Sequence, residues 1–128
     1  MHIRFLLTGI VAAALAVLLG AFGAHALKQS LTQEALSIFE TGVRYQMYHA
    51  FALLATGMLY ASFPNRKTIW AGRCFTIGII IFSGSLYALS LLMPNYRIIG
   101  AITPLGGMSF ITGWFLMFLS IIQHQPKS

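Results

Sequence analysis

The stretch Gly20-Ala21-Phe22-Gly23-Ala24-His25-Ala26-Leu27-Lys28 marks a change in the character of the chain. An apolar run that begins at Phe5 ends within it, and the residues that follow, to about Arg44, carry both acidic side chains of the protein. The upstream run has the length and composition of a helix that crosses a bilayer, whereas the downstream segment does not. The stretch therefore decides how the first helix turns back and which faces of the later helices meet.

The composition indicates a membrane protein. Hydrophobic residues make up 58% of the 128 residues and charged residues only 8%, with a mean hydropathy of +0.80. Ordinary soluble proteins carry about 25% charged residues. The net charge of +6 is scattered between apolar runs, which is typical of charges that flank transmembrane segments and not of a nucleic-acid-binding patch. Cys74, the single cysteine, excludes an intrachain disulfide and a multi-cysteine zinc site.

Four apolar runs predict four membrane spans. They cover about residues 5–24, 45–63, 74–93 and 104–122, and none contains Asp, Glu, Lys or Arg in its interior. Roughly 19–20 residues at 1.5 Å each match a hydrocarbon core of about 30 Å. Because lipid offers no hydrogen bonds to the backbone, such runs form helices. We predict an all-α fold, a single integral membrane domain over residues 1–128 that forms a four-helix bundle.

The N-terminus has a second interpretation as a signal peptide with a cleavage site at Ala24-His25-Ala26. The apolar run is longer than a signal core of about 7–15 residues, and three further spans follow, so we favour an uncleaved first helix. Lys and Arg counts then set the orientation. The side of the termini and the second loop holds Arg4, Arg66, Lys67, Arg73 and Lys127, against Lys28, Arg44 and Arg97 on the other, which predicts cytoplasmic termini.

The first loop predicts a short amphipathic helix between spans one and two. Apolar and polar residues of the segment 29–44 separate onto two faces, and Ser30 with Gln33 has the spacing of a capping box. The alternative is that helix two begins near Thr32 and continues into the membrane. In the third loop, Ile98 to Ile102 is too apolar for an exposed connection and is expected to pack on the bundle, with Thr103 as the N-cap of helix four.

Stripes of small and polar residues predict the faces that pack, because helices in lipid associate through small residues and hydrogen bonds. On helix one the stripe consists of Gly9, Ala13, Ala16, Gly20 and Gly23. On helix two it includes Tyr45 and His49, and on helix three it consists of Thr76, Ser83, Tyr87 and Ser90. The opening stretch is interpreted as a hinge that closes helix one against the helix at the end of the first loop, with His25 in the turn, where it satisfies backbone groups.

Several motifs resemble one family. The opening stretch, Tyr45-x-x-x-His49, Phe82-Ser83-Gly84-Ser85-Leu86-Tyr87 and Thr103-Pro104-x-Gly106-Gly107 with Gly113-Trp114 are similar to domain-of-unknown-function family 423. Its members are small bacterial inner-membrane proteins with a eukaryotic relative. The resemblance covers nearly the whole chain and implies a four-span protein of the bacterial cytoplasmic membrane. It implies no established activity, so no catalytic residue is carried over.

His49 is the strongest candidate for chemistry, because ionisable groups inside a membrane are rare and often functional. It is either a proton carrier or ligand, or a structural residue bonded to Tyr87 or to a serine of a neighbouring helix. His25 and His49 together suggest a bis-histidine haem or metal site. Two histidines without carboxylates or cysteines are weak evidence for such a site. We predict no cofactor and no metal. No nucleophile and base occur together in the sequence, so we predict no enzymatic activity.

Two hypotheses of function follow. The first is a structural or accessory membrane protein that packs against itself or against a larger membrane complex. The second is a small oligomeric transporter or channel that uses the stripe around His49. The stripes consist of small residues and hydroxyls, which favours close packing over a water-filled path. The first hypothesis is therefore preferred, with the lipid bilayer as the surrounding partner.

Overall fold

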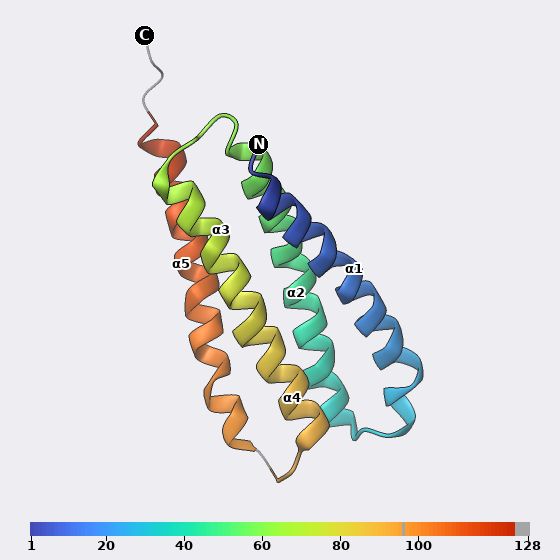
Figure 1. The fold of residues 1–128 in the computed structure, drawn as a ribbon. Helices are drawn as coiled ribbons and strands as arrows, with labels where there is room; N and C mark the ends of the chain where they lie inside the picture. The colour runs from blue at the N-terminus through green and yellow to red at the C-terminus, as the bar shows by residue number, and fades with distance from the viewer. Residues whose placement is uncertain (96, 125–128) are drawn as a thin grey trace.

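The computed structural model describes residues 1–95 and 97–124, and within these ranges the chain is helical without any strand. The elements are α1 (Ile3–His25), η1 (Leu27–Gln29), α2 (Gln33–Leu59), α3 (Arg66–Gly78), the π-helical turn η2 (Ile79–Ser83), α4 (Gly84–Leu92), η3 (Arg97–Ala101) and α5 (Thr103–Ile122). The rods α1, α2, α3–η2–α4 and α5 lie side by side in an up-and-down arrangement (Figure 1). The start of α1, the end of α5 and the α2–α3 connection lie at one end of the bundle, here called the termini end.

Three segments are long and apolar enough to cross a membrane: Ile3–Gln29, Arg66–Leu92 and Arg97–Ile122. All three are longer than the predicted runs, because α3 begins at Arg66 and because the first and third segments include the short helices η1 and η3. The helix α2 is not among the three, although it has 27 residues. Its first half carries two glutamates, an arginine and the polar side chains of Gln46 and His49, which lower its hydropathy.

The predicted short helix between spans one and two is not a separate element. One continuous helix runs from Gln33 to Leu59, as the alternative expectation had it. The expected cap at Ser30 is also wrong, because the Thr32 hydroxyl accepts the bond from the Ala35 N–H at 3.1 Å. Ser30 belongs instead to the turn after η1, where its N–H donates to the Leu27 carbonyl.

The rod α3–η2–α4 begins at Arg66 because Asn65 caps it. The Asn65 side-chain oxygen accepts from the N–H groups of Lys67 and Thr68 at 3.0 and 3.1 Å. The same turn is tied to α5, since the Asn65 amide donates to the Ser120 hydroxyl at 2.8 Å and the Thr68 and Ser120 hydroxyls lie 2.6 Å apart. These bonds hold the termini ends of α3 and α5 together.

Of two expectations for the third loop, one holds in part and one is wrong. The segment η3 lies against α4, where Ile99 and Gly100 are half-buried, but it has no fully buried residue and Ile98 is 81% exposed. Thr103 is the first residue of α5 and not its N-cap. Its hydroxyl lies 2.6 Å from that of Ser85 and thus joins α5 to α4.

Small residues of α1 lie against α2. A Cβ atom on Gly9 would come within 2.9 Å of the Ala50 carbonyl, and one on Gly23 within 2.9 Å of the Phe39 ring. Ala16 is buried, while Ala13 and Gly20 are half-buried. The helix does not break at Gly23 but continues to His25, so the turn is made by the residues after the opening glycines and not by a hinge within them.

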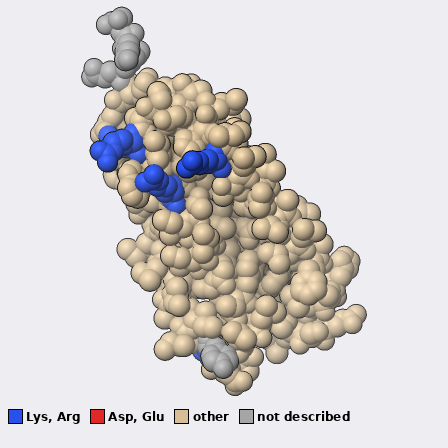
Figure 2. All heavy atoms as spheres, in the orientation of Figure 1, with Lys and Arg blue, Asp and Glu red and all other residues tan. Residues whose placement is uncertain are grey.

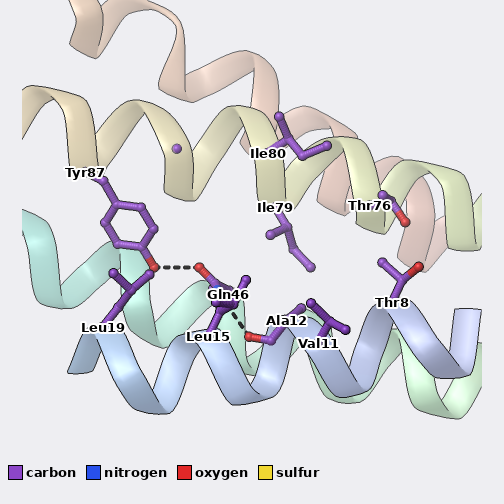
Figure 3. A pocket seen from close by; sticks show the side chains of 11 residues that line it. Thr8, Val11, Ala12, Leu15, Leu19, Gln46, Thr76, Ile79, Ile80 and Tyr87 are labelled. Atoms are coloured by element: carbon purple, nitrogen blue, oxygen red, sulfur yellow. Dashed lines mark hydrogen bonds between the residues drawn. The ribbon is translucent and has the colours of Figure 1, made fainter. Parts of the chain in front are cut away.

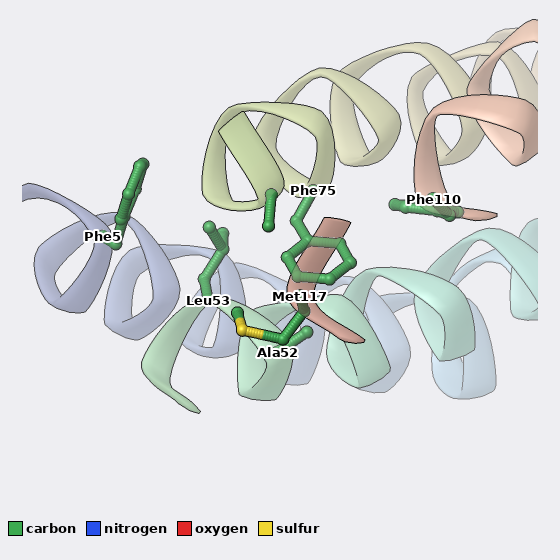
Figure 4. Packing of buried hydrophobic residues seen from close by; sticks show 7 residues of the cluster. Phe5, Ala52, Leu53, Phe75, Phe110 and Met117 are labelled. Atoms are coloured by element: carbon green, nitrogen blue, oxygen red, sulfur yellow. The ribbon is translucent and has the colours of Figure 1, made fainter. Parts of the chain in front are cut away.

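The apolar core is concentrated in the half of the bundle near the termini end. It draws side chains from α1, α2, α3 and α5, among them Phe5, Ala52, Leu53, Phe75, Phe110 and Met117 (Figure 4). Phe5 lies over Gly72, where a Cβ would come within 2.5 Å of its ring. This contact brings α1 against α3 near their first turns.

Candidate functional site

Gln46 joins three helices in the middle of the bundle. It is 5% exposed, and its side-chain nitrogen donates to the Ala12 carbonyl of α1 at 2.8 Å. Its side-chain oxygen accepts from the Tyr87 hydroxyl of α4 at 2.7 Å. In a membrane a buried amide needs such partners, because lipid supplies none. Gln46 was not among the predicted site residues, although it is the single Gln or Asn inside the four predicted runs, and this is the signal by which it could have been found.

His49 has partners on both ring nitrogens. Nδ1 lies 2.8 Å from the Tyr45 carbonyl oxygen, and Nε2 lies 3.2 Å from the indole nitrogen of Trp114. A carbonyl only accepts and an indole N–H only donates, so these bonds require a neutral ring that is protonated on Nδ1. The ring is 5% exposed and stacks on Phe110 with centroids 3.4 Å apart. His49 is thus held as a fully paired group between α2 and α5.

The predicted bond between His49 and Tyr87 or a serine is wrong. Tyr87 is occupied by Gln46, and His49 lies three residues further along α2, where its ring meets α5. The serine of η2, Ser83, bonds instead to the Gly42 carbonyl at 2.7 Å. The partner of His49 that sequence reasoning did not anticipate is Trp114, which is 51% exposed and therefore lies at the outer edge of the contact.

Tyr45 lies next to His49 on the outer side of the bundle. It packs against Phe82 with ring centroids 4.8 Å apart and is 37% exposed. Together with His49, Phe110 and Trp114 it lines an outward-facing hollow of about 340 Å³ between α2 and α5. Aromatic side chains make up most of the lining of this hollow.

The structure does not bring His25 and His49 together. His25 is exposed at the end of α1, and nearby Gly23 lies at the level of Phe39. Phe39 and His49 are ten residues apart on α2, about 15 Å along the axis. Among the described residues, no three His, Cys, Asp or Glu side chains gather closely enough to hold a metal ion. In the turn after α1 the Leu27 carbonyl accepts from the N–H groups of Ser30 and Leu31, at 3.0 and 2.9 Å, so these backbone groups bond to one another and not to His25.

A groove lies on the opposite side of Gln46, between α1 and the rod α3–η2–α4. It has a volume of about 460 Å³ and is lined mainly by aliphatic side chains. Thr8 and Thr76 lie at one end and Leu19 and Tyr87 at the other, with Gln46 at its floor (Figure 3). The groove exists because α1 packs mainly on α2 and leaves a gap beside α4.

Comparisons with known proteins agree with the membrane character of these surfaces. Residues 19–107 match the family described as "Protein of unknown function (DUF423)". A UPF0382 membrane protein of Staphylococcus saprophyticus is 44% identical over 90% of this chain and 93% of its own. The UPF0382 membrane protein YwdK of Bacillus subtilis is 40% identical over 94% and 97%.

A more distant relative is the UPF0382 inner membrane protein YgdD of Escherichia coli K12, 35% identical over 87% of this chain and 83% of its own. No solved structure gives a significant match. The names of these relatives state a membrane location and no enzymatic activity. The chain is therefore a helical membrane protein that belongs to the DUF423 family of proteins of unknown function.

Proposed function

We propose that this protein is a structural or accessory component of the bacterial cytoplasmic membrane, without enzymatic activity, and that it crosses the bilayer four times. The helix α2 would be the fourth span. Its 27 residues extend about 40 Å, more than a hydrocarbon core of about 30 Å. Gln46 and His49 are each 5% exposed and are bonded inside the bundle, whereas Phe51 and Met58 are exposed and suit contact with lipid.

We further propose that both termini lie in the cytoplasm. Figure 2 shows Lys and Arg side chains gathered near the termini end of the bundle. Arg4 belongs to the first turn of α1, Arg66 and Lys67 belong to the first turn of α3, and Arg73 lies about two turns further along α3, while Lys127 lies outside the described residues. Positive charge near the ends of spans favours the cytoplasmic side. A fluorescent protein fused to the C-terminus should fluoresce in cells, and a periplasmic phosphatase fused there should be inactive; the reverse pattern would contradict the orientation.

One observation carries the accessory role: the buried polar side chains of the middle of the bundle bond to neighbouring helices. Gln46 bonds to α1 and α4, Ser83 to α2, and His49 to α5. A residue that carries protons or solutes needs a free polar atom on a path through the membrane. Here these atoms serve to hold helices in register, which is the role that polar groups commonly have in membrane bundles.

The second candidate is a small oligomeric transporter or channel. The hollow beside Tyr45 and His49 favours it, because it opens outward and would be covered by another copy of the chain. Against it, a proton reaches Nε2 of His49 only after the bond from Trp114 breaks. The aromatic lining also offers few polar contacts to water or ions.

Reconstitution into liposomes with an imposed pH gradient separates the two candidates. The accessory role predicts that wild-type protein conducts protons no faster than empty liposomes and that His49→Ala lowers the unfolding temperature in detergent. Trp114→Phe, which removes the indole donor and part of the ring but leaves His49 in place, should lower it less. A wild-type flux that is lost in a stable His49→Ala variant would establish transport. Co-purification of the tagged protein from native membranes then tests whether it associates with itself or with a reproducible membrane complex.

A further inference from the structure

The groove between α1 and the rod α3–η2–α4 has the depth of one lipid leaflet. From Thr8 at one end to Leu19 at the other it follows eleven residues of α1, which is about 16 Å. Half of a hydrocarbon core of about 30 Å is about 15 Å. Thr8 and Thr76 stand at the end of the groove nearer the termini end (Figure 3). The walls between are aliphatic, with Val11 and Leu15 on one side and Ile80 on the other.

Two arginines stand above that end of the groove. Arg4 precedes Thr8 by one helical turn, and Arg73 precedes Thr76 by three residues, so each lies on the groove side of its helix. Phe5, the residue after Arg4, contacts Gly72, the residue before Arg73, and this contact brings the two helices together at this level. Figure 2 shows basic side chains gathered on this face where α1 and α3 begin. Both arginines are exposed.

The surroundings of Arg73 are suited to a phospholipid head group. Its guanidinium lies 4.8 Å from the centre of the Trp70 ring, which holds the side chain against the helix. Arg66, Trp70 and Arg73 also line a shallow hollow of about 190 Å³. Guanidinium groups bind phosphate oxygens through paired hydrogen bonds, and tryptophan is enriched at the level of the head groups.

We propose that the protein binds one anionic glycerophospholipid at this place. Its phosphate lies between Arg4 and Arg73, and one acyl chain lies in the groove down to Leu19 and Tyr87. Only the choice of leaflet rests on the proposed topology: the lipid belongs to the cytoplasmic leaflet if the termini are cytoplasmic. The site itself requires only that the termini end lies at a membrane surface.

Native mass spectrometry of the detergent-purified protein tests the site directly, with dioleoyl-phosphatidylglycerol as the probe and dioleoyl-phosphatidylcholine as the comparison. The wild type should bind the first phosphatidylglycerol more tightly than the first phosphatidylcholine. A basic residue near a membrane surface contributes about 1 kcal/mol, so Arg4→Gln with Arg73→Gln should weaken phosphatidylglycerol about 30-fold and remove the preference. Arg97→Gln, at the opposite end of the bundle, is the matched control and should leave both the affinity for phosphatidylglycerol and the preference unchanged.

A second pair of variants tests the groove. Gly84 lines it, and a Cβ there meets nothing within 4 Å, so Gly84→Leu fills the groove without disturbing the helices. It should lower the occupancy of the first bound lipid for both head groups. Gly107→Leu is its control, because Gly107 faces the hollow between α2 and α5 and a Cβ there has nothing closer than 3.8 Å.

Three results would overturn the proposal. The first is equal affinity of the wild type for phosphatidylglycerol and phosphatidylcholine. The second is that Arg97→Gln weakens phosphatidylglycerol as much as Arg4→Gln with Arg73→Gln does. The third is that Gly107→Leu loses as much bound lipid as Gly84→Leu. A protein dimer that excludes lipid and dissociates with Gly84→Leu would assign the groove to a second copy and would overturn it as well. Circular dichroism and the unfolding temperature of each variant show that it is folded. Because binding is measured without a gradient or a partner, its failure is distinct from failure of the accessory role.

Discussion

Replacing Gln46 with Met should loosen the bundle at its centre. The substitution keeps the length and unbranched shape of the side chain but removes both of its hydrogen bonds. Ala12 lies inside α1, so its carbonyl keeps its helical partner when the Gln46 nitrogen is lost. The Tyr87 hydroxyl, in contrast, loses the acceptor that lies 2.7 Å away. The expected cost is therefore dominated by the bond to Tyr87.

The magnitude follows from hydrogen bonds measured in membrane proteins. Each contributes about 0.6 kcal/mol on average, with a maximum of about 1.7 kcal/mol. Two bonds give about 1.2 kcal/mol, and an unsatisfied buried hydroxyl adds roughly 1 kcal/mol, at the lower end of its usual range because Tyr87 is only half-buried. Gln46→Met should lower the free energy of unfolding by about 2 kcal/mol.

A double-mutant cycle with Tyr87→Phe, measured by equilibrium unfolding in detergent with increasing dodecyl sulfate, isolates the bond. Tyr87→Phe should cost about 1 kcal/mol in the wild type, whereas in Gln46→Met it removes the unsatisfied hydroxyl and should restore up to about 1 kcal/mol. Thr112→Val is the control, because that exposed hydroxyl bonds within its own helix, and it should stay within about 0.5 kcal/mol. If Tyr87→Phe costs as much in Gln46→Met as in the wild type, the two side chains are not coupled and the reasoning fails.

The same unfolding assay tests three further predictions. Gly106→Ala should lower the free energy of unfolding by about 1–3 kcal/mol, because its Cβ would run into the backbone of η2. Gly84→Ala should be neutral or stabilising, because a Cβ there meets open space. Equal effects of the two variants would contradict this packing. Ser120→Ala should cost about 1 kcal/mol by removing the bonds from α5 to the start of α3, and no loss would refute that link. Trp114→Phe should cost about 0.6 kcal/mol through the lost bond to His49, and it should do so only when His49 is present.

The helical class and the membrane character of the chain could be predicted from its composition. Hydropathy depends on each segment alone, so the apolar stretches now found in α1, the rod α3–η2–α4 and α5 were visible without any knowledge of their neighbours. Their starts were less predictable. Asn65 caps α3 within a turn that appears polar, so the predicted run at residue 74 began well after the helix. The four-span count remains a proposal, because the polar side chains that α2 buries inside the bundle make its hydropathy lower than that of the other three segments.

Helical arithmetic was a poorer guide where the helix is irregular. At 100° per residue, Thr76 and Ser83 fall on one line, and the sequence predicted a single stripe through them and Tyr87. In the structure Thr76 lines the groove toward α1, whereas Ser83 is buried against Gly42 of α2. The π-helical turn η2 begins after Thr76 and ends at Ser83, and it changes the rotation of the residues along it. Nothing in the local composition indicates that turn.

The sequence by itself determined that this protein is an all-helical membrane protein with small residues on α1, because apolar length and residue size are properties of one segment. Only the tertiary structure decided which polar groups meet. It paired Gln46 with Tyr87 and His49 with Trp114, and it left a groove below Arg4 and Arg73. The physical reason is that a side-chain hydrogen bond in lipid needs a partner on another helix, and its choice depends on the order, rotation and spacing of all the helices together.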